Sequence, residues 1–326
     1  MVHHHWRPTA SIAALNRRAD LLWRLRTFFH DQAMREVHTP ILGSESVIDR
    51  HIDPVVLAGS SLSLREFRDQ DFYLQTSPEF GMKRLLVAGM RDIYQISPVF
   101  RAGERGQFHN PEFTMVEWYR LDEGLLAATE FLSQLIRAVL ETDAAEIETY
   151  QSVFFAATAC DPLDCTLADL ARVASRLELA VDANWSDDQD AWLDLIFSEA
   201  VGPQLGLNRP MIVTHYPASQ SALARISADD PRTAERFELY MGGIELANGY
   251  HELLDAGELA RRNTQVALER RGDGKPPLPT SSHLEAAMRV GLPACSGCAL
   301  GFDRLLMVDR QANSIDEVIA FPIERA

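Results

Sequence analysis

Two adjacent glycines, at positions 242 and 243, constrain the fold of this 326-residue chain more than any other feature. They separate two strand-like runs, 237-FELYM-241 and 244-IELANGYHEL-253. Glycine accepts the positive φ angles of tight hairpin turns, so the two runs are predicted to pair as an antiparallel hairpin. Most other predicted strands are also joined by hairpins, not by regular helical crossovers. The sequence therefore favours an α+β fold, an antiparallel sheet flanked by helices.

Two glutamates of this hairpin are predicted to share one face of the sheet. In a hairpin closed around the two glycines, paired positions add up to an odd number, and Glu238 with Glu245 meet this condition. One interpretation is a Mg²⁺ site, because this ion is bound by one or two carboxylates plus substrate phosphates. The other is a pair of solvated surface glutamates. Farther along, Asn248 and Glu252 are four positions apart, so on a strand their side chains would point to the same face. Together they could hold an ammonium group.

Hydrophobic periodicity predicts the remaining elements. A long amphipathic helix is expected over 11–37, followed by a short strand over 36–42 that Pro40 interrupts. The section 121–210 is mostly helical in pattern and is interpreted as packing around a core, without a catalytic cluster. The other expected elements are strands over 71–80, 92–100 and 211–217, helices over 79–89, 127–142 and 187–202, and a strand entering a helix over 297–308.

Composition narrows the possible locations and partners. Apolar runs such as 85-LLVAG-89 are far shorter than the roughly 20 residues of a membrane span. The first residues lack the apolar core of a signal peptide, so a cytoplasmic location is expected. With 47 acidic against 31 basic residues and a net charge of −16, the chain lacks the basic balance of proteins that grip nucleic-acid phosphates. We therefore expect neither tRNA nor DNA as the principal partner.

Cysteine and histidine groups raise the question of a metal site. The pairs Cys160 with Cys165 and Cys295 with Cys298 have short spacings that zinc sites can show, but the second pair lies in a Gly-rich apolar run. We interpret the cysteines as small buried hydrophobic residues. Three histidines at positions 3–5 have no further ligand-type residues nearby and are interpreted as a disordered end or a vector remnant.

The segment 113-FTMVEWYR-120 reads as a strand with a charged residue on an apolar face. Alternation places four side chains on one side, those of Phe113, Met115, Glu117 and Tyr119. A glutamate buried there without a partner would be costly, so this face is expected to border a polar cleft. Arg101, at the end of the preceding strand, would bind phosphate, and Phe113 offers a ring for a nucleobase. Since the chain has no P-loop motif, these features predict an ATP site on an antiparallel sheet.

Three segments together resemble the motifs of class II aminoacyl-tRNA synthetases of the lysine type. The segment 100-FRAGERGQFHNPEFTMVEWY-119 resembles motif 2, 297-GCALGFDRL-305 resembles motif 3, and 36-EVHTPIL-42 resembles motif 1, which forms the dimer interface in that family. Lysine-type features recur at 76-TSPEF-80 and 245-ELANGYHEL-253. The resemblance spans nearly the whole chain and implies the class II fold and a homodimer.

A difference at the N-terminus refines this resemblance. Lysyl-tRNA synthetases carry an anticodon-binding barrel before the catalytic domain, whereas here the motif 1 helix begins at about residue 11. The chain is therefore most similar to the freestanding paralogues that ligate β-lysine to elongation factor P, also at 215-HYPASQSALA-224 and 317-EVIAFPIERA-326. In that family ATP activates (R)-β-lysine as an adenylate, which passes to a lysine side chain of elongation factor P. We expect a single class II catalytic domain over 1–326, without an anticodon-binding domain.

The resemblance implies a role for each matching residue, with ATP and Mg²⁺ as cofactors. The catalytic residues would be Arg101, on the α-phosphate, and Arg304, on the γ-phosphate. The ATP site would also include Ala102, Gly103, Glu104, His109, Asn110, Phe113, Glu245, Leu246 and Gly301. Glu238 and Glu245 would hold Mg²⁺. Lysine or β-lysine would be bound by Ser77, Pro78, Glu79, Tyr119, Asn248, Glu252 and Ala299.

Two positions depart from the pattern of lysyl-tRNA synthetases. The family usually has Arg-Asn-Glu after the motif 2 phenylalanine, the glutamate reading the adenine edge, whereas Gly103 occupies the glutamate position here. Either Glu104 shifts in or backbone groups read the adenine. In motif 3, Ala299 replaces a middle glycine and matches the freestanding ligases. Its methyl group at the floor of the amino-acid site is consistent with a preference for the β-isomer.

Two alternative functions stay open on the sequence. One is the same chemistry with a different acceptor, a tRNA or a small molecule; the acidic charge and the missing barrel argue against tRNA. The other is an inactive paralogue with a regulatory role. The presence of Arg101, Arg304 and the metal-type carboxylates argues against inactivity, and Gly103 is the one feature that favours it.

Overall fold

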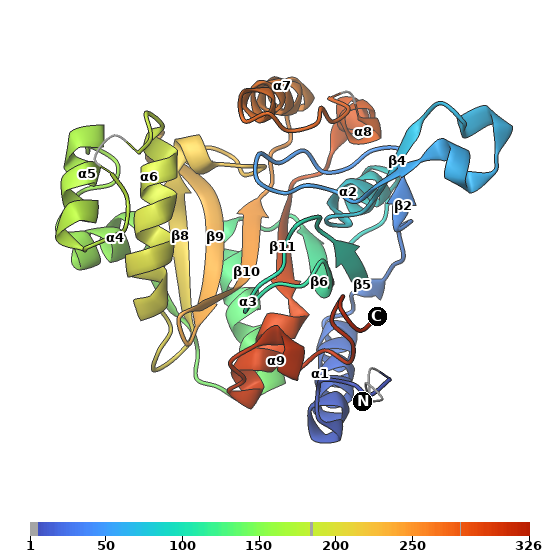
Figure 1. Cartoon of the computed structure of the whole chain (residues 1–326), viewed down its shortest axis with the longest axis horizontal. Coiled ribbons are helices and arrows are strands. Elements are labelled where there is room, and N and C mark those ends of the chain that lie inside the picture. Colours follow the sequence, from blue (N-terminus) through green and yellow to red (C-terminus); the bar gives the residue numbers. More distant parts are fainter. Residues whose placement is uncertain (1–5, 183–184, 281) are drawn as a thin grey trace, which may run out of the picture. The chain divides into compact units, whose positions relative to one another are not determined.

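The computed structural model describes residues 6–182, 185–280 and 282–326, so the three N-terminal histidines lie outside the described residues. The chain divides into two compact units. The first unit consists of Met1–Asp122 and Leu253–Ala326, and the second of Glu123–Glu252 (Figure 1). No described helix is both long and apolar enough to span a bilayer.

Strands of the first unit form one larger and one smaller sheet. The larger has four strands of this unit in the order β1 (Arg35–Glu36), β5 (Ile93–Phe100), β6 (Glu112–Leu121) and β11 (Cys295–Gly301). The strands β5, β6 and β11 are antiparallel neighbours, whereas β1 runs parallel to β5. The smaller sheet has the order β2 (Leu42–Gly43), β4 (Asp71–Leu74) and β3 (Val56–Ala58).

Helix α1 (Ile12–Asp31) covers one face of this larger sheet. It begins at Ser11, whose hydroxyl accepts a hydrogen bond from the amide of Ala14. The buried ring of Phe29 stacks on Tyr94 of β5 and contacts Trp118 of β6. The other helical elements of the unit are α2 (Glu79–Val87), α7 (Ala256–Gly272), α8 (His283–Gly291), α9 (Phe302–Arg310) and three short 3-10 turns, Gly59–Leu62, Arg65–Phe67 and Ile315–Glu317.

The second unit combines four strands with the helical middle of the chain. Its strands follow the order β10 (Ile244–His251), β9 (Thr233–Met241), β8 (Met211–Pro217) and β7 (Glu146–Thr149). Its helices are α3 (Leu125–Leu140), α4 (Tyr150–Thr158), α5 (Leu167–Arg176) and α6 (Gln189–Ile196), which continues as a π turn over Phe197–Val201; short 3-10 turns cover Gly202–Gln204 and Ala218–Gln220. The buried side chains of Phe154, Trp192 and Ile196 form part of its core.

The structure confirms the predicted α+β class and most of the predicted elements, with three differences. Two strand pairs, β1 with β5 and β7 with β8, are parallel, and β7 lies within the section predicted to be mostly helical. The first helix ends at Asp31 rather than near residue 37, because the chain turns at Ala33, whose φ is positive. The strand predicted over 36–42 is two short strands, β1 and β2, on either side of Pro40.

The four cysteines form no disulfide bond. Cys295 and Cys298 are buried in β11, as the sequence predicted, whereas Cys160 and Cys165 are half-buried. Burial raises the pKa of the Cys165 thiol to about 12, so this thiol is protonated near pH 7. Among the residues that the structure describes, no three His, Cys, Asp or Glu side chains are grouped so that they could hold a metal ion.

Candidate active site

The glycine hairpin positions the carboxylates of the second unit. Gly242 and Gly243 form the turn between β9 and β10 with φ angles of 59° and 76°, as predicted for paired glycines. Glu245 lies opposite Tyr240, which is two residues from Glu238 on β9. Because alternate residues of a strand point to one face, the prediction that Glu238 and Glu245 share a face is confirmed.

A β-bulge brings a further polar side chain to the same face. The register shifts between Glu245 and Ala247, so that Asn248 lies directly opposite Glu238. Leu246, at the bulge, is buried with 2% of its surface exposed. We call Glu238, Glu245 and Asn248 the hairpin face. The bulge was not predicted, since an unbroken register would place Asn248 on the opposite side from Glu245.

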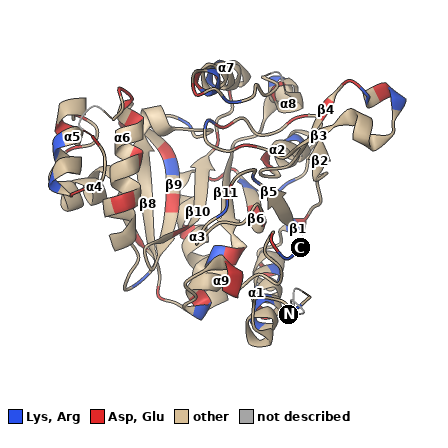
Figure 2. Ribbon diagram, in the orientation of Figure 1, with Lys and Arg blue, Asp and Glu red and all other residues tan. Residues whose placement is uncertain are grey.

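Glu238 is buried and already has several partners. One of its oxygens is ion-paired with Arg236, and the other accepts hydrogen bonds of 2.6 Å from the hydroxyls of Tyr216 and Tyr240. Figure 2 shows adjacent basic and acidic segments along β9. The guanidinium of Arg236 also lies over the ring of Tyr216, 4.6 Å from its centroid. Glu238 therefore acts as the buried counterion of the half-buried Arg236.

These carboxylates fit Mg²⁺ only in part. Glu245 is half-buried and its carboxylate is a hard oxygen ligand of the type that Mg²⁺ prefers. Glu238 instead has Arg236 on one oxygen and two hydroxyls on the other. A metal ion bound by both carboxylates would need Glu238 to change partners, whereas Glu245 could bind Mg²⁺ together with substrate phosphates.

Of the two residues predicted to bind the ammonium group, Asn248 lies in β10 and Glu252 directly follows it. The amide nitrogen of Asn248 is 3.2 Å from the hydroxyl oxygen of Tyr250, and its buried Oδ1 has no hydrogen-bond partner among the described residues. Glu252 is fully buried at a bridge with Ala224, and its carbonyl accepts a hydrogen bond from Arg225. An amide oxygen and a buried carboxylate are groups that can accept hydrogen bonds from an ammonium.

In the first unit, two arginines flank one histidine. The guanidinium of Arg304, on α9, donates to Nε2 of His109 at 2.6 Å, and Arg101 lies over the ring of Phe113 at 5.1 Å. Burial, together with the charges of Arg304 and Arg101, lowers the pKa of His109 to about 4. The imidazole is therefore neutral near pH 7 and accepts the hydrogen bond from Arg304. We call Arg101, His109, Phe113 and Arg304 the arginine cluster.

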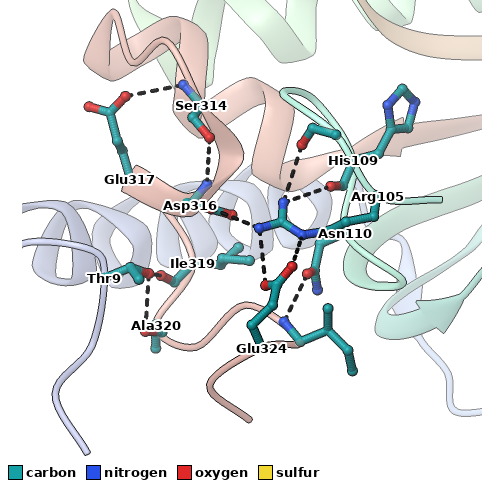
Figure 3. A network of polar contacts seen from close by, with 12 residues as sticks. Thr9, Arg105, His109, Asn110, Ser314, Asp316, Glu317, Ile319, Ala320 and Glu324 are labelled. Carbon is teal, nitrogen blue, oxygen red and sulfur yellow. Dashed lines mark hydrogen bonds and ion pairs between the residues drawn. The ribbon is translucent and has the colours of Figure 1, made fainter. Parts of the chain in front are cut away.

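The loop between β5 and β6 carries Arg101 and His109 of this cluster. Gly103 has a φ of 78°, a conformation that other residues rarely adopt, which accounts for a glycine at this turn. The carboxylate of Glu104 returns to within 3.8 Å of the Arg101 guanidinium, and the amide of Ala102 donates to the carbonyl of Asp53. Asn110 is buried, and its side chain donates to the carbonyl of Glu112. It also accepts a hydrogen bond from the backbone amide of Ile323 (Figure 3).

A second polar group surrounds Glu117 in the middle of β6. Its carboxylate is 2% exposed and accepts 2.7 Å hydrogen bonds from the hydroxyls of Ser77 and Tyr119. Ser77 also accepts from the amide of Glu79, which begins α2 after Pro78. Glu79 is ion-paired with the buried Lys83 at 2.5 Å. We call Ser77, Glu79, Lys83, Glu117 and Tyr119 the carboxylate cluster.

Comparison of the chain with known proteins shows the family to which it belongs. The family model of class II tRNA synthetases (D, K and N) matches residues 2–325. The chain belongs to this class II tRNA synthetase family. The elongation factor P–(R)-β-lysine ligase of Edwardsiella ictaluri is 43% identical over 323 residues, which are 98% of this chain and 98% of that protein.

In this class II chain, the strand β11 completes the surroundings of both clusters. Ala299 lies opposite Glu117 on β6, so its methyl group is on the same face as the carboxylate cluster. Gly297 lies opposite Tyr119 and adds no side chain beside that ring. Gly301 precedes α9, which carries Arg304. The structure thus brings together the residues predicted on motif 2, on motif 3 and in 76-TSPEF-80 within the first unit.

Two members of the carboxylate cluster were not assigned to the site from the sequence. Lys83 was seen only as part of an expected helix, although its spacing of four residues from Glu79 is typical of a helical ion pair. Glu117 was expected to border a polar cleft, and the structure instead buries it against two hydroxyls. Its position between Met115 and Tyr119 in an apolar strand was the signal that a partner must exist.

Proposed function

We propose that this protein is an ATP-dependent ligase that activates (R)-β-lysine as an adenylate and transfers it to a lysine side chain of elongation factor P. The observation that carries this proposal is the 43% identity, over 98% of both chains, to a protein of that name. The arginine cluster and the carboxylate cluster support it, because they supply groups for a triphosphate and for an amine.

The first step joins the amino-acid carboxylate to the α-phosphorus of ATP and releases pyrophosphate. We assign Arg101 to the α-phosphate and Arg304 to the γ-phosphate, because both guanidinium groups belong to one cluster around the neutral His109. Fixed cations of this kind stabilise charge that develops at phosphorus. Phe113 would stack on adenine, Gly301 would let the nucleotide approach the backbone, and either Glu104 or a backbone group would face the purine edge.

Binding of the amino acid is assigned to residues with acidic and hydroxyl side chains. Within the first unit, an amino group of β-lysine would be received by Glu79 and Tyr119. Ser77 would hold the carboxylate of Glu117 in place, and Ala299 would shape the floor of the site. Carboxylate and amide oxygens suit these ligands because an ammonium group is a donor only.

Mg²⁺ would neutralise charge on the phosphates when it is bound with ATP. In this proposal Glu245 is its direct protein ligand. Glu238 would be a second ligand only after exchanging partners, and otherwise holds Arg236 and the strand face in place.

We further propose that the two units act as one catalytic domain and that the protein works in the cytoplasm. We also propose that two copies associate through the motif 1 region.

A transfer assay with radiolabelled (R)-β-lysine and ATP tests the function. We expect label on elongation factor P and pyrophosphate release, with no label on a factor whose acceptor lysine is replaced by arginine. Arg101→Ala should abolish the labelling, whereas Arg232→Met, an exposed arginine of the second unit, should retain it. Label on tRNA but not on the factor would contradict the proposal. Pyrophosphate exchange with each lysine isomer would then identify the amino acid.

A further inference from the structure

One arginine joins the loop between β5 and β6 to the C-terminal segment. The guanidinium of Arg105 donates to Glu324 at 2.6 and 3.1 Å and to Asp316 at 2.9 Å (Figure 3). It also lies 3.3 Å from the carbonyl oxygen of Gly106 and 3.5 Å from that of His109. One side chain therefore holds two carboxylates of the segment and two carbonyl groups of its own loop.

Further hydrogen bonds join the same two segments. The side-chain Nε2 of Gln107 donates to the carbonyl of Asn313, and the backbone carbonyl of Gln107 accepts from the backbone amide of Ile315. Ile323 donates to the side chain of Asn110 at 3.1 Å. The loop is thus bound to residues 313–324 through three of its residues, Arg105, Gln107 and Asn110. We call residues 313–324 the C-terminal brace.

The brace is itself anchored on both sides. Val318 is fully buried and Ile315 is 2% exposed. The hydroxyl and the amide of Thr9 donate to the carbonyls of Ile319 and Ala320 (Figure 3). A capping box between Ser314 and Glu317 closes its short 3-10 turn. The loop is therefore held by a segment that has its own core contacts.

The loop needs such support because it carries cationic groups. Arg101 and Arg304 both approach His109, whose backbone forms a bridge with Gly106 directly beside Arg105. Among the anionic groups near this cluster, the carboxylate of Glu104 lies 3.8 Å from the guanidinium of Arg101. A loop that is fixed in advance loses less conformational freedom when its ligand binds.

We infer that Arg105 is a positioning residue for ATP, through which the C-terminal brace holds the β5–β6 loop in its nucleotide-binding conformation. The inference rests on the proposed function for the identity of the ligand. Arg105 itself contacts carboxylates and carbonyls rather than the ligand. Its loss should therefore weaken ATP binding while leaving the amino-acid site of the carboxylate cluster unchanged.

Steady-state pyrophosphate exchange separates these effects. Arg105→Met should raise the KM for ATP by about three- to tenfold, the range expected when two partly exposed ion pairs are lost, with the KM for the amino acid unchanged. Arg105→Lys should restore only part of the effect, because an ammonium lacks the planar fork that contacts Asp316 and Glu324 at once. Glu324→Gln and Asp316→Asn should each give a smaller change than Arg105→Met.

The matched control is Arg232→Met. Arg232 also pairs with two carboxylates, Asp230 and Asp164, and its side chain is 47% exposed against 32% for Arg105. It lies in the second unit. The control should leave the KM for ATP at the wild-type value.

Hydrogen exchange gives a readout that needs no activity. In Arg105→Met, backbone amides of residues 104–110 should exchange about tenfold faster, whereas the core of β6 keeps its protection. The inference would be overturned if Arg105→Met had the wild-type KM for ATP and the wild-type hydrogen-exchange rates in residues 104–110. A parallel rise of both KM values with a lower Tm would also overturn it, because it would indicate general destabilisation. If the wild-type protein shows no pyrophosphate exchange with any lysine isomer, the proposed function fails. In that case the hydrogen-exchange rates of residues 104–110 alone decide whether the brace holds the loop.

Discussion

Glu117 is a residue whose protonation is expected to change near neutral pH. Burial and the neighbouring charge of Glu79 raise the pKa of Glu117 to about 7, from an ordinary value of 4.5. The folded protein therefore retains a proton that the unfolded chain releases. The stabilisation that results is complete below about pH 4.5 and is lost as the pH rises through about 7.

This linkage predicts the behaviour of Glu117→Gln, whose amide cannot ionise. Relative to the wild type, the variant should gain on the order of 2 kcal/mol of unfolding free energy between pH 5 and pH 8. Urea unfolding at intervals across this range measures the difference. Glu112→Gln, an exposed change on the same strand, is the control. A constant difference between Glu117→Gln and the wild type would contradict the assignment.

The two carboxylates of the hairpin face should differ when each loses its charge. Glu245→Gln is expected to abolish adenylate formation while folding is retained, because it removes the assigned Mg²⁺ ligand. Glu238→Gln should instead lower the unfolding free energy by about 3 kcal/mol, because Arg236 would lose its buried counterion. Pyrophosphate exchange and urea unfolding on both variants measure the two effects. Equal losses of stability would show that the two residues do not have separate roles.

At the scale of elements, the glycine turn allows a matched pair of substitutions. A Cβ added at Gly242 would meet nothing within 4 Å, whereas one at Gly243 would lie 2.7 Å from the carbonyl oxygen of Pro203. Both positions have positive φ. Gly242→Ala should therefore cost about 1–2 kcal/mol of unfolding free energy from backbone strain alone, and Gly243→Ala clearly more. Thermal and urea unfolding test the order, and the reverse order would contradict it.

The same hairpin shows how far the sequence predicts the site. Its turn, its two strands and the shared face of Glu238 and Glu245 follow from the paired glycines and from alternation. The bulge that brings Asn248 to that face does not, because one extra residue changes the side of every later residue without a residue type that marks it. Likewise, the contact of Lys83 with Glu79 follows from helical spacing, whereas the burial of Glu117 depends on Ser77, forty residues away along the chain.

At the scale of the whole molecule, the resemblance to the β-lysine ligase includes both units. The identity covers 98% of the chain, so it extends over the helical middle as well as over the segments that carry the motifs. The sequence predicted that middle section as core packing, and its buried aromatic and aliphatic residues agree. The net charge of −16 of the whole chain is one reason why we propose a protein acceptor rather than a tRNA.

Association of two copies is the last property expected of the whole molecule. Helix α1, which precedes the motif 1 strand, exposes Ile12 and Trp23 to 67% and 68%. These two side chains belong to the helix that leads into the segment resembling motif 1, which forms the dimer interface in class II synthetases. Light scattering coupled to size exclusion should give a molar mass twice the 36.5 kDa of one chain. Trp23→Glu should lower the measured mass to that of the monomer. Phe155→Glu, a change at a 55% exposed residue of the second unit, should leave the mass unchanged. A wild-type mass of one chain would contradict the dimer, and a dimeric Trp23→Glu would exclude this helix face from the interface.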